Sequence, residues 1–399
     1  MKWYKDITVS IAVIASVVAL SVLSNYSPKN EFNSVAKDII ELCEGSVYTP
    51  SCYDEEIPKL MDEGYTMEEA FAVTKEVQRL DESYQYCHVL GHYLSAKETA
   101  KDPEKWKDVV ARAPLGVCSN GAVHGAFQER FRVESMPERD IEDIAPELDG
   151  VCEPRKDWQP TLMGQATCIH ALGHLTMYVT QADIHKSVEL CEILVEETSN
   201  ETKRQLCYDG AFMQIYQPLD PEDFALIVGK EIETKEASEE FCSQFHVYAE
   251  SSCVSESWPL YYEDIQSPDT ISLICNRVST DEQNERCMSA MFFVAMAQSN
   301  LSSEWAVDFC SRISSGYRGT CFGNSASRLI EVDSRNVEEA LELCYSAEES
   351  GAAAPCFDEL LKYSGYTFAV GSDEFYELCE GMPERWKGSC LSQDGRERL

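Results

Sequence analysis

Histidine is the residue type whose distribution along this chain indicates chemistry. Six of the seven histidines precede residue 186, and five fall in the short segments CHVLGH, CSNGAVHG and CIHALGH. Those five are His88, His92, His124, His170 and His174. In two segments the histidines are four residues apart, a spacing that puts both imidazoles on one helical face about one turn apart. Imidazoles so placed can share a metal ion, and we predict a transition-metal site formed by all five.

Other residue types could complete or use this site. Asp209 stands two residues after Cys207, the offset that His170 has from Cys168, and is a candidate metal ligand. Glu129 is a candidate general base, with a solvated surface position as the alternative. Imidazole ligands suit Cu, Zn or Fe, in one site or a dinuclear one, and bis-histidine haem is a third option. Metal-activated water or copper redox chemistry would follow if the protein is an enzyme.

Several other kinds of site are excluded. Neither HxxGH segment has the HExxH pattern, so the zincin mechanism with its internal Glu base does not apply. No two of the 18 cysteines are closer than nine residues, which removes every CxxC-based zinc, redox or iron–sulfur motif. With 33 Lys and Arg against 70 Asp and Glu, the formal charge is −37. Phosphates repel such a chain, so we expect no nucleic-acid partner.

The elements that must position the histidines form a repeat. From Cys242 to Cys379 a first cysteine recurs every 33–35 residues, and a second follows it 11 or 12 residues later. A period near 34 is typical of stacked helical hairpins. Val337, Ala340 and Leu341 lie at i, i+3 and i+4, which also indicates a helix. We predict an all-α solenoid of about nine hairpin repeats, each with one helix ending at the first cysteine and another beginning at the second.

A disulfide across each turn would staple each hairpin. The first half follows the pattern less regularly, and there we pair Cys43 with Cys52, Cys152 with Cys168, Cys191 with Cys207 and, by elimination, Cys87 with Cys118. Tetratricopeptide repeats share the period, but their aromatic, Gly and Pro signature is missing. Sel1-like repeats have cysteines closer together, so no family is assigned.

The repeat also supplies an internal control for the histidines. The later units have no histidine at the matching offsets from their second cysteines, so ordinary repeat packing does not explain the cluster. Gly91, Gly125, Gly173 and Gly210 fall in the same predicted helices, where each costs about 1 kcal/mol relative to Ala. Close helix packing or room for a ligand would offset that cost.

The N-terminus indicates the compartment. Residues 7–24 are uncharged and long enough for a spanning helix, and the two lysines before them favour a cytoplasmic N-terminus. The alternative is a cleaved signal peptide, which would make the protein secreted. We divide the chain into a stub at 1–6, this anchor, a linker at 25–37, repeats with the histidine cluster at 38–235 and further repeats at 236–399. A disulfide framework places the body outside the cytoplasm.

Two functions from different classes remain. One is an extracytoplasmic, membrane-anchored protein that binds a metal through the histidine cluster and uses the later repeats as a scaffold. The other is a metal-free surface solenoid that binds a protein partner and whose histidines are buried and hydrogen-bonded to one another. The first requires at least three of the imidazoles to converge on a common point.

Overall fold

The computed structural model describes residues 28–392, except for 82, 85, 115–116, 119–120, 132–144, 147, 157, 196–200, 219–220 and 369–371. The regular secondary structure of these described residues is helical and includes no strand, as expected for an all-α chain; their single β-bridge joins Arg155 to Trp158. The chain divides into two compact units, with the boundary between Leu90 and Gly91.

The described residues of the first unit form three α-helices and the start of a fourth. They are α2 (Pro28–Cys43), α3 (Thr49–Glu56), α4 (Met67–Leu80) and α5 (His88–Thr99), of which α5 continues into the second unit. Helix α2 occupies much of the segment that we expected to be a linker. Ala36, Ile39 and Cys43 are buried along one face of it, which explains why this polar-looking segment is helical.

The second unit begins with helices that carry most of the histidine cluster. They are α6 (Trp106–Arg112), α7 (Gly121–Arg130), α9 (Leu162–Val179), α10 (Ile184–Leu194), α11 (Glu201–Tyr216) and α12 (Pro221–Leu226). Regular helix pairs follow. They are α13 (Lys235–Cys242) and α14 (Val247–Glu256), then α15 (Tyr262–Ile265), α16 (Ser272–Cys275) and α17 (Asp281–Gln298), then α18 (Ser303–Arg312) and α19 (Arg318–Val332), α20 (Val337–Ser346) and α21 (Ala353–Thr367), and α22 (Asp373–Gly381) and α23 (Glu384–Leu391).

Disulfides join the two helices of each pair, as the cysteine spacing predicted. All five bridges expected from Cys242 onward are present, and so are Cys43–Cys52, Cys152–Cys168 and Cys191–Cys207. Cys87 and Cys118, which the sequence paired by elimination, are both disulfide-bonded, and no cysteine is free. This framework indicates an oxidising compartment outside the cytoplasm.

The second helix of a pair begins earlier than the sequence suggested. We expected it to begin at the second cysteine, but α9 begins at Leu162, ahead of Cys168, and α17 at Asp281, ahead of Cys287. Thr161 and Thr280 cap these two helices by accepting a hydrogen bond from a backbone N–H three residues later. A helix begins at its N-cap residue and not at the cysteine of its disulfide. The predicted starts of α9 and α17 were therefore almost two helical turns too late.

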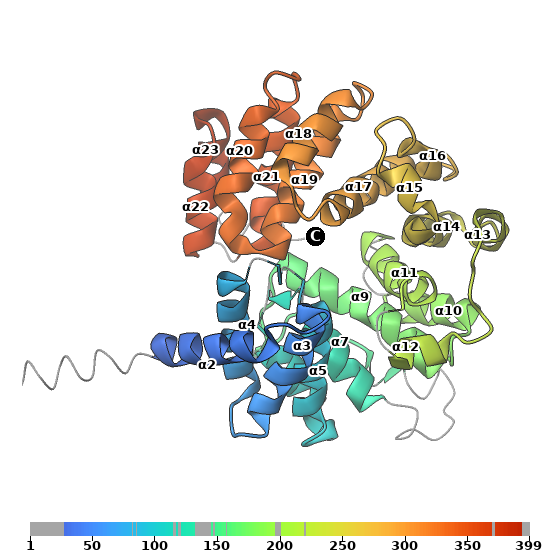
Figure 1. Ribbon diagram of the computed structural model, residues 1–399. Helices are drawn as coiled ribbons and strands as arrows, with labels where there is room; N and C mark the ends of the chain where they lie inside the picture. Colours follow the sequence, from blue (N-terminus) through green and yellow to red (C-terminus); the bar gives the residue numbers. More distant parts are fainter. Residues whose placement is uncertain are drawn as a thin grey trace, which may run out of the picture. The chain divides into compact units, whose positions relative to one another are not determined.

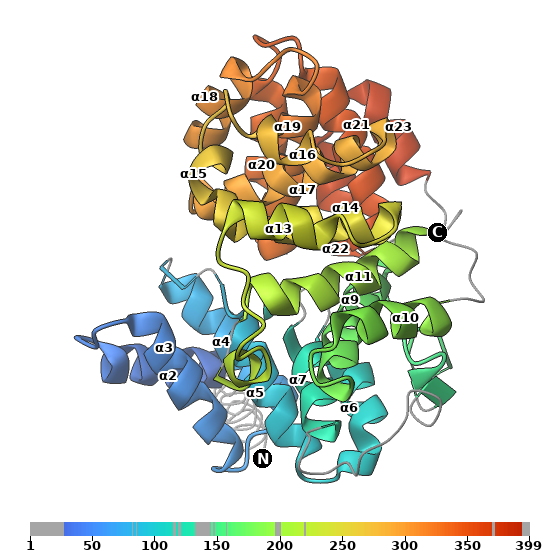
Figure 2. The ribbon, with the colours of Figure 1, turned by 90° about the vertical axis from the view of Figure 1, so that its right-hand side faces the viewer.

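The second helices of successive pairs pack against one another. In order along the chain, contacts join α7 to α9, α9 to α11, α11 to α14, α14 to α17, α17 to α19 and α19 to α21 (Figures 1 and 2). Helix α21 also contacts α9, the helix that carries two of the histidines. The fold is therefore repeat-like, and α9 is held by neighbours from both ends of this series.

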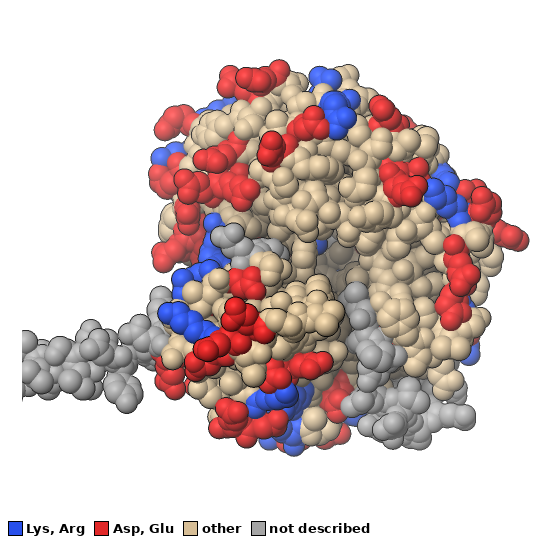
Figure 3. Space-filling model, viewed as in Figure 1, with Lys and Arg blue, Asp and Glu red and all other residues tan. Residues whose placement is uncertain are grey.

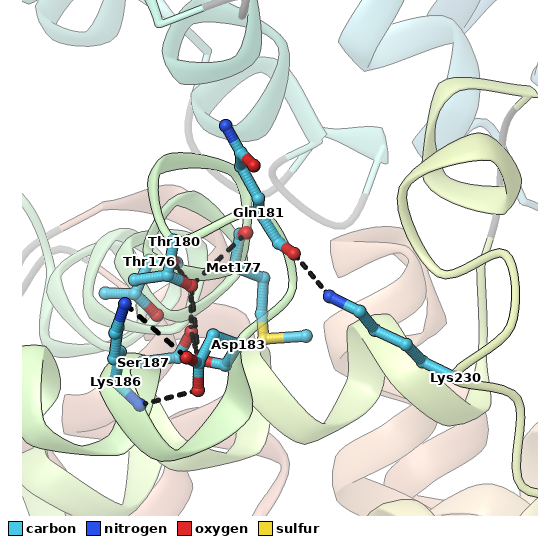
Figure 4. A network of polar contacts seen from close by, with 8 residues as sticks. All are labelled: Thr176, Met177, Thr180, Gln181, Asp183, Lys186, Ser187 and Lys230. Carbon is cyan, nitrogen blue, oxygen red and sulfur yellow. Dashed lines mark hydrogen bonds and ion pairs between the residues drawn. The ribbon is translucent and has the colours of Figure 1, made fainter. Parts of the chain in front are cut away.

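A polar network holds the turn that follows α9 (Figure 4). Gln181 and Ala182 have φ of 53° and 56°, a left-handed conformation that non-glycine residues seldom adopt. The hydroxyls of Thr180 and Ser187 share a hydrogen bond of 2.7 Å, and Lys230 donates one to the carbonyl oxygen of Gln181. These bonds fix the C-terminal end of α9 against α10.

The expected anchor at 7–24 lies outside the described residues. Within the part that the structure does describe, no helix combines the length and the apolar character needed to cross a membrane. Carboxylates are distributed widely over the face drawn in Figure 3, consistent with the acidic composition.

Candidate metal centre

Helices α5, α7 and α9 bring four histidines together in the second unit. His92 is on α5, His124 on α7, and His170 and His174 are one turn apart on α9. The side chains of His92, His124 and His174 are at least 93% buried, whereas His170 is half-buried. Imidazoles that cluster in a protein interior need polar partners, because burying an unsatisfied polar group is costly.

Glycines let these helices approach closely enough to group the histidines. A Cβ atom on Gly125 would lie 2.1 Å from the carbonyl oxygen of His92. A Cβ on Gly173 would lie 2.0 Å from the carbonyl oxygen of Cys207, and one on Gly210 would lie 1.9 Å from that of His170. No side chain fits in such a gap, so these glycines bring α5 against α7 and α9 against α11. Close packing, one of the two explanations that the sequence left open, accounts for them.

His124, His170 and His174 form a triad of convergent ring nitrogens. One nitrogen of each lies within 4.8 Å of the other two, an arrangement that could hold a metal ion. The Nε2 atoms of His170 and His174 are 3.2 Å apart and hydrogen-bonded to each other, a contact that the metal-free alternative also expects. Two nitrogens bound to one tetrahedral metal at about 2.0–2.1 Å lie about 3.3 Å apart, so this pair already has the spacing of two ligands of one ion.

His170 is a neutral imidazole at physiological pH. The protein atoms that displace water around its ring, and then the neighbouring His174 and Arg286, lower the pKa of His170 to about 3. A neutral imidazole keeps a lone pair that a metal can accept, whereas an imidazolium does not. Because His170 is the least buried member of the triad, it is also the one nearest to solvent.

Glutamine side chains orient two of the imidazoles. Nδ1 of His174 is 2.7 Å from Oε1 of Gln214, and Nδ1 of His92 is 3.1 Å from Oε1 of Gln128. An amide oxygen only accepts hydrogen bonds, so each Nδ1 carries the proton and each Nε2 carries the lone pair. Metal-binding histidines commonly donate their second ring N–H to a neighbouring acceptor in this way.

The remaining predicted site residues lie as follows. His88 is the first residue of α5, in the first unit, on the same helical face as His92 and one turn before it. Asp209 is buried on α11 and forms an ion pair with Arg286; it is not in the triad. Glu129 is half-buried near the end of α7 and is likewise not in the triad.

A second polar group beside the triad was missed by the sequence analysis. Arg286 on α17 pairs with Asp209, and its charge also acts on His170 and on Glu256 of α14. Burial, reinforced by the negative charge of Asp209, raises the pKa of Glu256 to about 8, and Gln217 donates a 2.8 Å hydrogen bond to it. Arg286 and Glu256 lie in later repeats that lack the paired histidine spacing, so no local pattern linked them to the cluster.

The two histidines outside the cluster, His185 and His246, are exposed. His185 stacks on Phe245, and Nε2 of His246 is 3.2 Å from a carboxylate oxygen of Glu192.

Comparison of the chain with models of known families, with characterised proteins and with solved structures gives no match.

Proposed function

We propose that this chain is a metal-binding protein whose His124, His170 and His174 hold a transition-metal ion. The observation that carries the proposal is the convergence of three ring nitrogens, contributed by two helices, to within 4.8 Å of one another. The Gln214 hydrogen bond supports it because that bond leaves Nε2 of His174 as the ligand atom. The internal repeat supports it too, since no later unit has such histidines.

The donor set bears on the identity of the metal. Three imidazoles without a thiolate suit Zn, Cu or Fe. Haem fits less well, because axial ligands on opposite sides of an iron are about 4 Å apart, twice a metal–nitrogen bond of about 2 Å. Nε2 of His170 and Nε2 of His174 are only 3.2 Å apart and would have to be neighbours on any shared metal.

If these three imidazoles were the only protein ligands, the metal would keep a coordination position for water or a substrate. Such a metal can activate water or, in the case of copper or iron, exchange electrons. Residues of this chain that would serve such chemistry are Glu256 and Asp209, because both interact with Arg286, whose charge also acts on His170. Glu129, the general base expected from the sequence, stays a prediction.

The metal centre belongs to a larger proposed arrangement. The hairpin pairs of the second unit and their successive contacts support a solenoid arrangement of its helices. Residues 7–24 would anchor it in a membrane, with the disulfide-bonded body outside the cytoplasm. The surface of the later repeats would then be available to a protein partner.

Metal titration of the full chain tests this function. Zn(II) and Cu(II) are titrated in competition with a chromophoric chelator, and His124→Gln, His170→Gln and His174→Gln are compared with the surface variants His185→Gln and His246→Gln. We expect the wild type and the two surface variants to bind one ion equally, and each triad variant to bind at least tenfold more weakly. Circular dichroism confirms folding. No binding by the wild type would favour the metal-free scaffold instead.

A further inference from the structure

A chain of hydrogen bonds runs from His92 to a buried carboxylate on another helix. Oε1 of Gln128 is 3.1 Å from Nδ1 of His92, and Nε2 of Gln128 is 3.0 Å from the hydroxyl of Tyr178. That hydroxyl donates to Asp223 of α12, and Nε2 of Gln128 is 3.4 Å from the same Asp223 oxygen. The chain connects α5, α7, α9 and α12, and Asp223 is 97% buried.

The carboxylate sets the direction of every bond in this chain. An ionised Asp223 can only accept, so the Tyr178 hydroxyl must donate to it. The hydroxyl oxygen then accepts from the Gln128 amide nitrogen, which also faces Asp223. Because both hydrogens of the Gln128 amide are directed toward Tyr178 and Asp223, Gln128 must present its oxygen to His92.

The consequence is a fixed tautomer at His92. An amide oxygen beside Nδ1 requires Nδ1 to carry the proton, which leaves the lone pair on Nε2. The His92 ring lies edge-on to that of His124, with centroids 5.1 Å apart, and a ring nitrogen of each lies within 4.8 Å of the other. His92 is therefore next to the triad but outside it, with one ring nitrogen committed to the hydrogen-bond chain.

We propose that Asp223, acting through Tyr178 and Gln128, holds His92 as an additional metal ligand that binds through Nε2 on the His124 side of the triad. This inference rests on the proposed function. Asp223, Tyr178 and Gln128 are positioning residues, since none of them touches the metal. The chain also explains Gln128 and Tyr178, each of which stands four residues after a triad histidine, at the same helical spacing.

Two readouts test the inference on the full chain. The first is the tautomer of His92 in metal-free, ¹⁵N-histidine-labelled protein, measured from two-bond ¹H–¹⁵N correlations and assigned with His92→Gln. The second is the affinity for Zn(II) in chelator competition. The first readout needs no metal, so it is independent of the proposed function.

The expected results follow from the direction of the bonds. In the wild type, Nδ1 of His92 carries the proton. Asp223→Asn lets the chain reverse, so the His92 tautomers become mixed and Zn(II) binding weakens about 10–100-fold, as for other residues that orient metal ligands. Tyr178→Phe weakens binding less, because the Gln128–Asp223 contact remains. His92→Gln weakens it at least as much as Asp223→Asn.

Two further variants separate positioning from general stability. Tyr216→Phe removes a buried hydroxyl that hydrogen-bonds to Ser238 rather than to a glutamine, and should behave as the wild type does. Gln128→Glu combined with Asp223→Asn moves the carboxylate directly onto Nδ1 of His92. This double variant should restore both the single tautomer and the affinity.

The two proposals fail in different ways. A wild type that binds Zn(II) while Asp223→Asn and His92→Gln bind it equally well would overturn this inference and leave the triad intact as the metal site. A proton on Nε2 of His92 in the wild type would also overturn it. A wild type that binds no metal would overturn the proposed function, and the ligand role of His92 with it.

Discussion

At the scale of single residues, the candidate centre depends on proton placement. His170 is neutral because its surroundings disfavour the imidazolium, and His174 is oriented by an amide oxygen. Neither property needs a metal to be present. Each makes the nitrogen atoms that converge between α7 and α9 available as ligands at neutral pH.

The lowered pKa of His170 predicts a pH dependence of stability. The ordinary pKa is 6.5 and the folded value is about 3, so between these limits the unfolded chain binds a proton that the folded protein does not. The free energy of unfolding of the metal-free protein should therefore fall as the pH falls through this window, by at most about 1.4 kcal/mol per pH unit from this residue.

Chemical denaturation between pH 7 and pH 4 measures this contribution. His170→Gln removes the titrating ring, so the decline in its unfolding free energy should be shallower than in the wild type. His185→Gln, on the surface, is the matched control and should follow the wild type. Parallel curves for wild type and His170→Gln would show that His170 is protonated in the folded state.

Part of this centre was predictable from local spacing. The sequence placed His170 and His174 on one helical face correctly. Residues four apart lie about one turn apart on a helix, and the segment that contains them is helical. The sequence did not predict the partners Gln214, Asp223 and Arg286. Each of them comes from another helix and is brought to the cluster by tertiary packing alone. Their chemical types are common on helix surfaces, so nothing in the sequence distinguished them.

At the scale of elements, the glycine-mediated contact of α9 with α11 positions the site. Gly173 and Gly210 meet the opposite backbone directly, so the two helices cannot separate without moving His170 and His174. The sequence predicted these helices but misplaced their starts, since a threonine cap, rather than a cysteine, determines where α9 begins. Cysteine spacing reports which helices are joined, and caps report where they start.

Replacing Gly173 with Ala tests the close contact. Its Cβ would lie 2.0 Å from the carbonyl oxygen of Cys207, so α9 and α11 must move apart. We expect destabilisation of about 3 kcal/mol or more and a loss of metal affinity. Gly388 is the matched control: it is also inside a helix, α23, but has nothing within 4 Å of an added Cβ.

Gly388→Ala should stabilise the protein by up to about 1 kcal/mol, because alanine is the better helix former. Denaturant unfolding of both variants gives the comparison. Equal effects of the two substitutions would mean that α9 and α11 are not packed backbone against backbone.

At the scale of the whole molecule, stability is distributed over many small disulfide-stapled pairs. The bridges close loops of similar length, so each stabilises its own pair by a similar amount in the chain-entropy model. They differ in what they hold: Cys152–Cys168 ends on α9, beside the histidines, whereas Cys379–Cys390 joins the last pair. The effect of removing a disulfide on metal binding should therefore depend on which helix pair that disulfide joins.

Replacing each of these cysteine pairs with alanine separates the two effects. Both variants should lose about 3 kcal/mol of unfolding free energy, because the bridges span 16 and 11 residues. Metal affinity should fall only in the variant without Cys152–Cys168. Equal losses of affinity would indicate that the metal centre depends on the stability of the whole array rather than on α9.

Elemental analysis of the untagged full chain, produced in an oxidising compartment, shows directly whether the protein holds a metal ion. It is made beside a variant that combines His124→Gln, His170→Gln and His174→Gln. The account predicts one transition-metal ion per chain in the wild type and none in the folded variant. A wild type without metal even after loading with Zn(II) and Cu(II), or a variant with the same metal content, would contradict it.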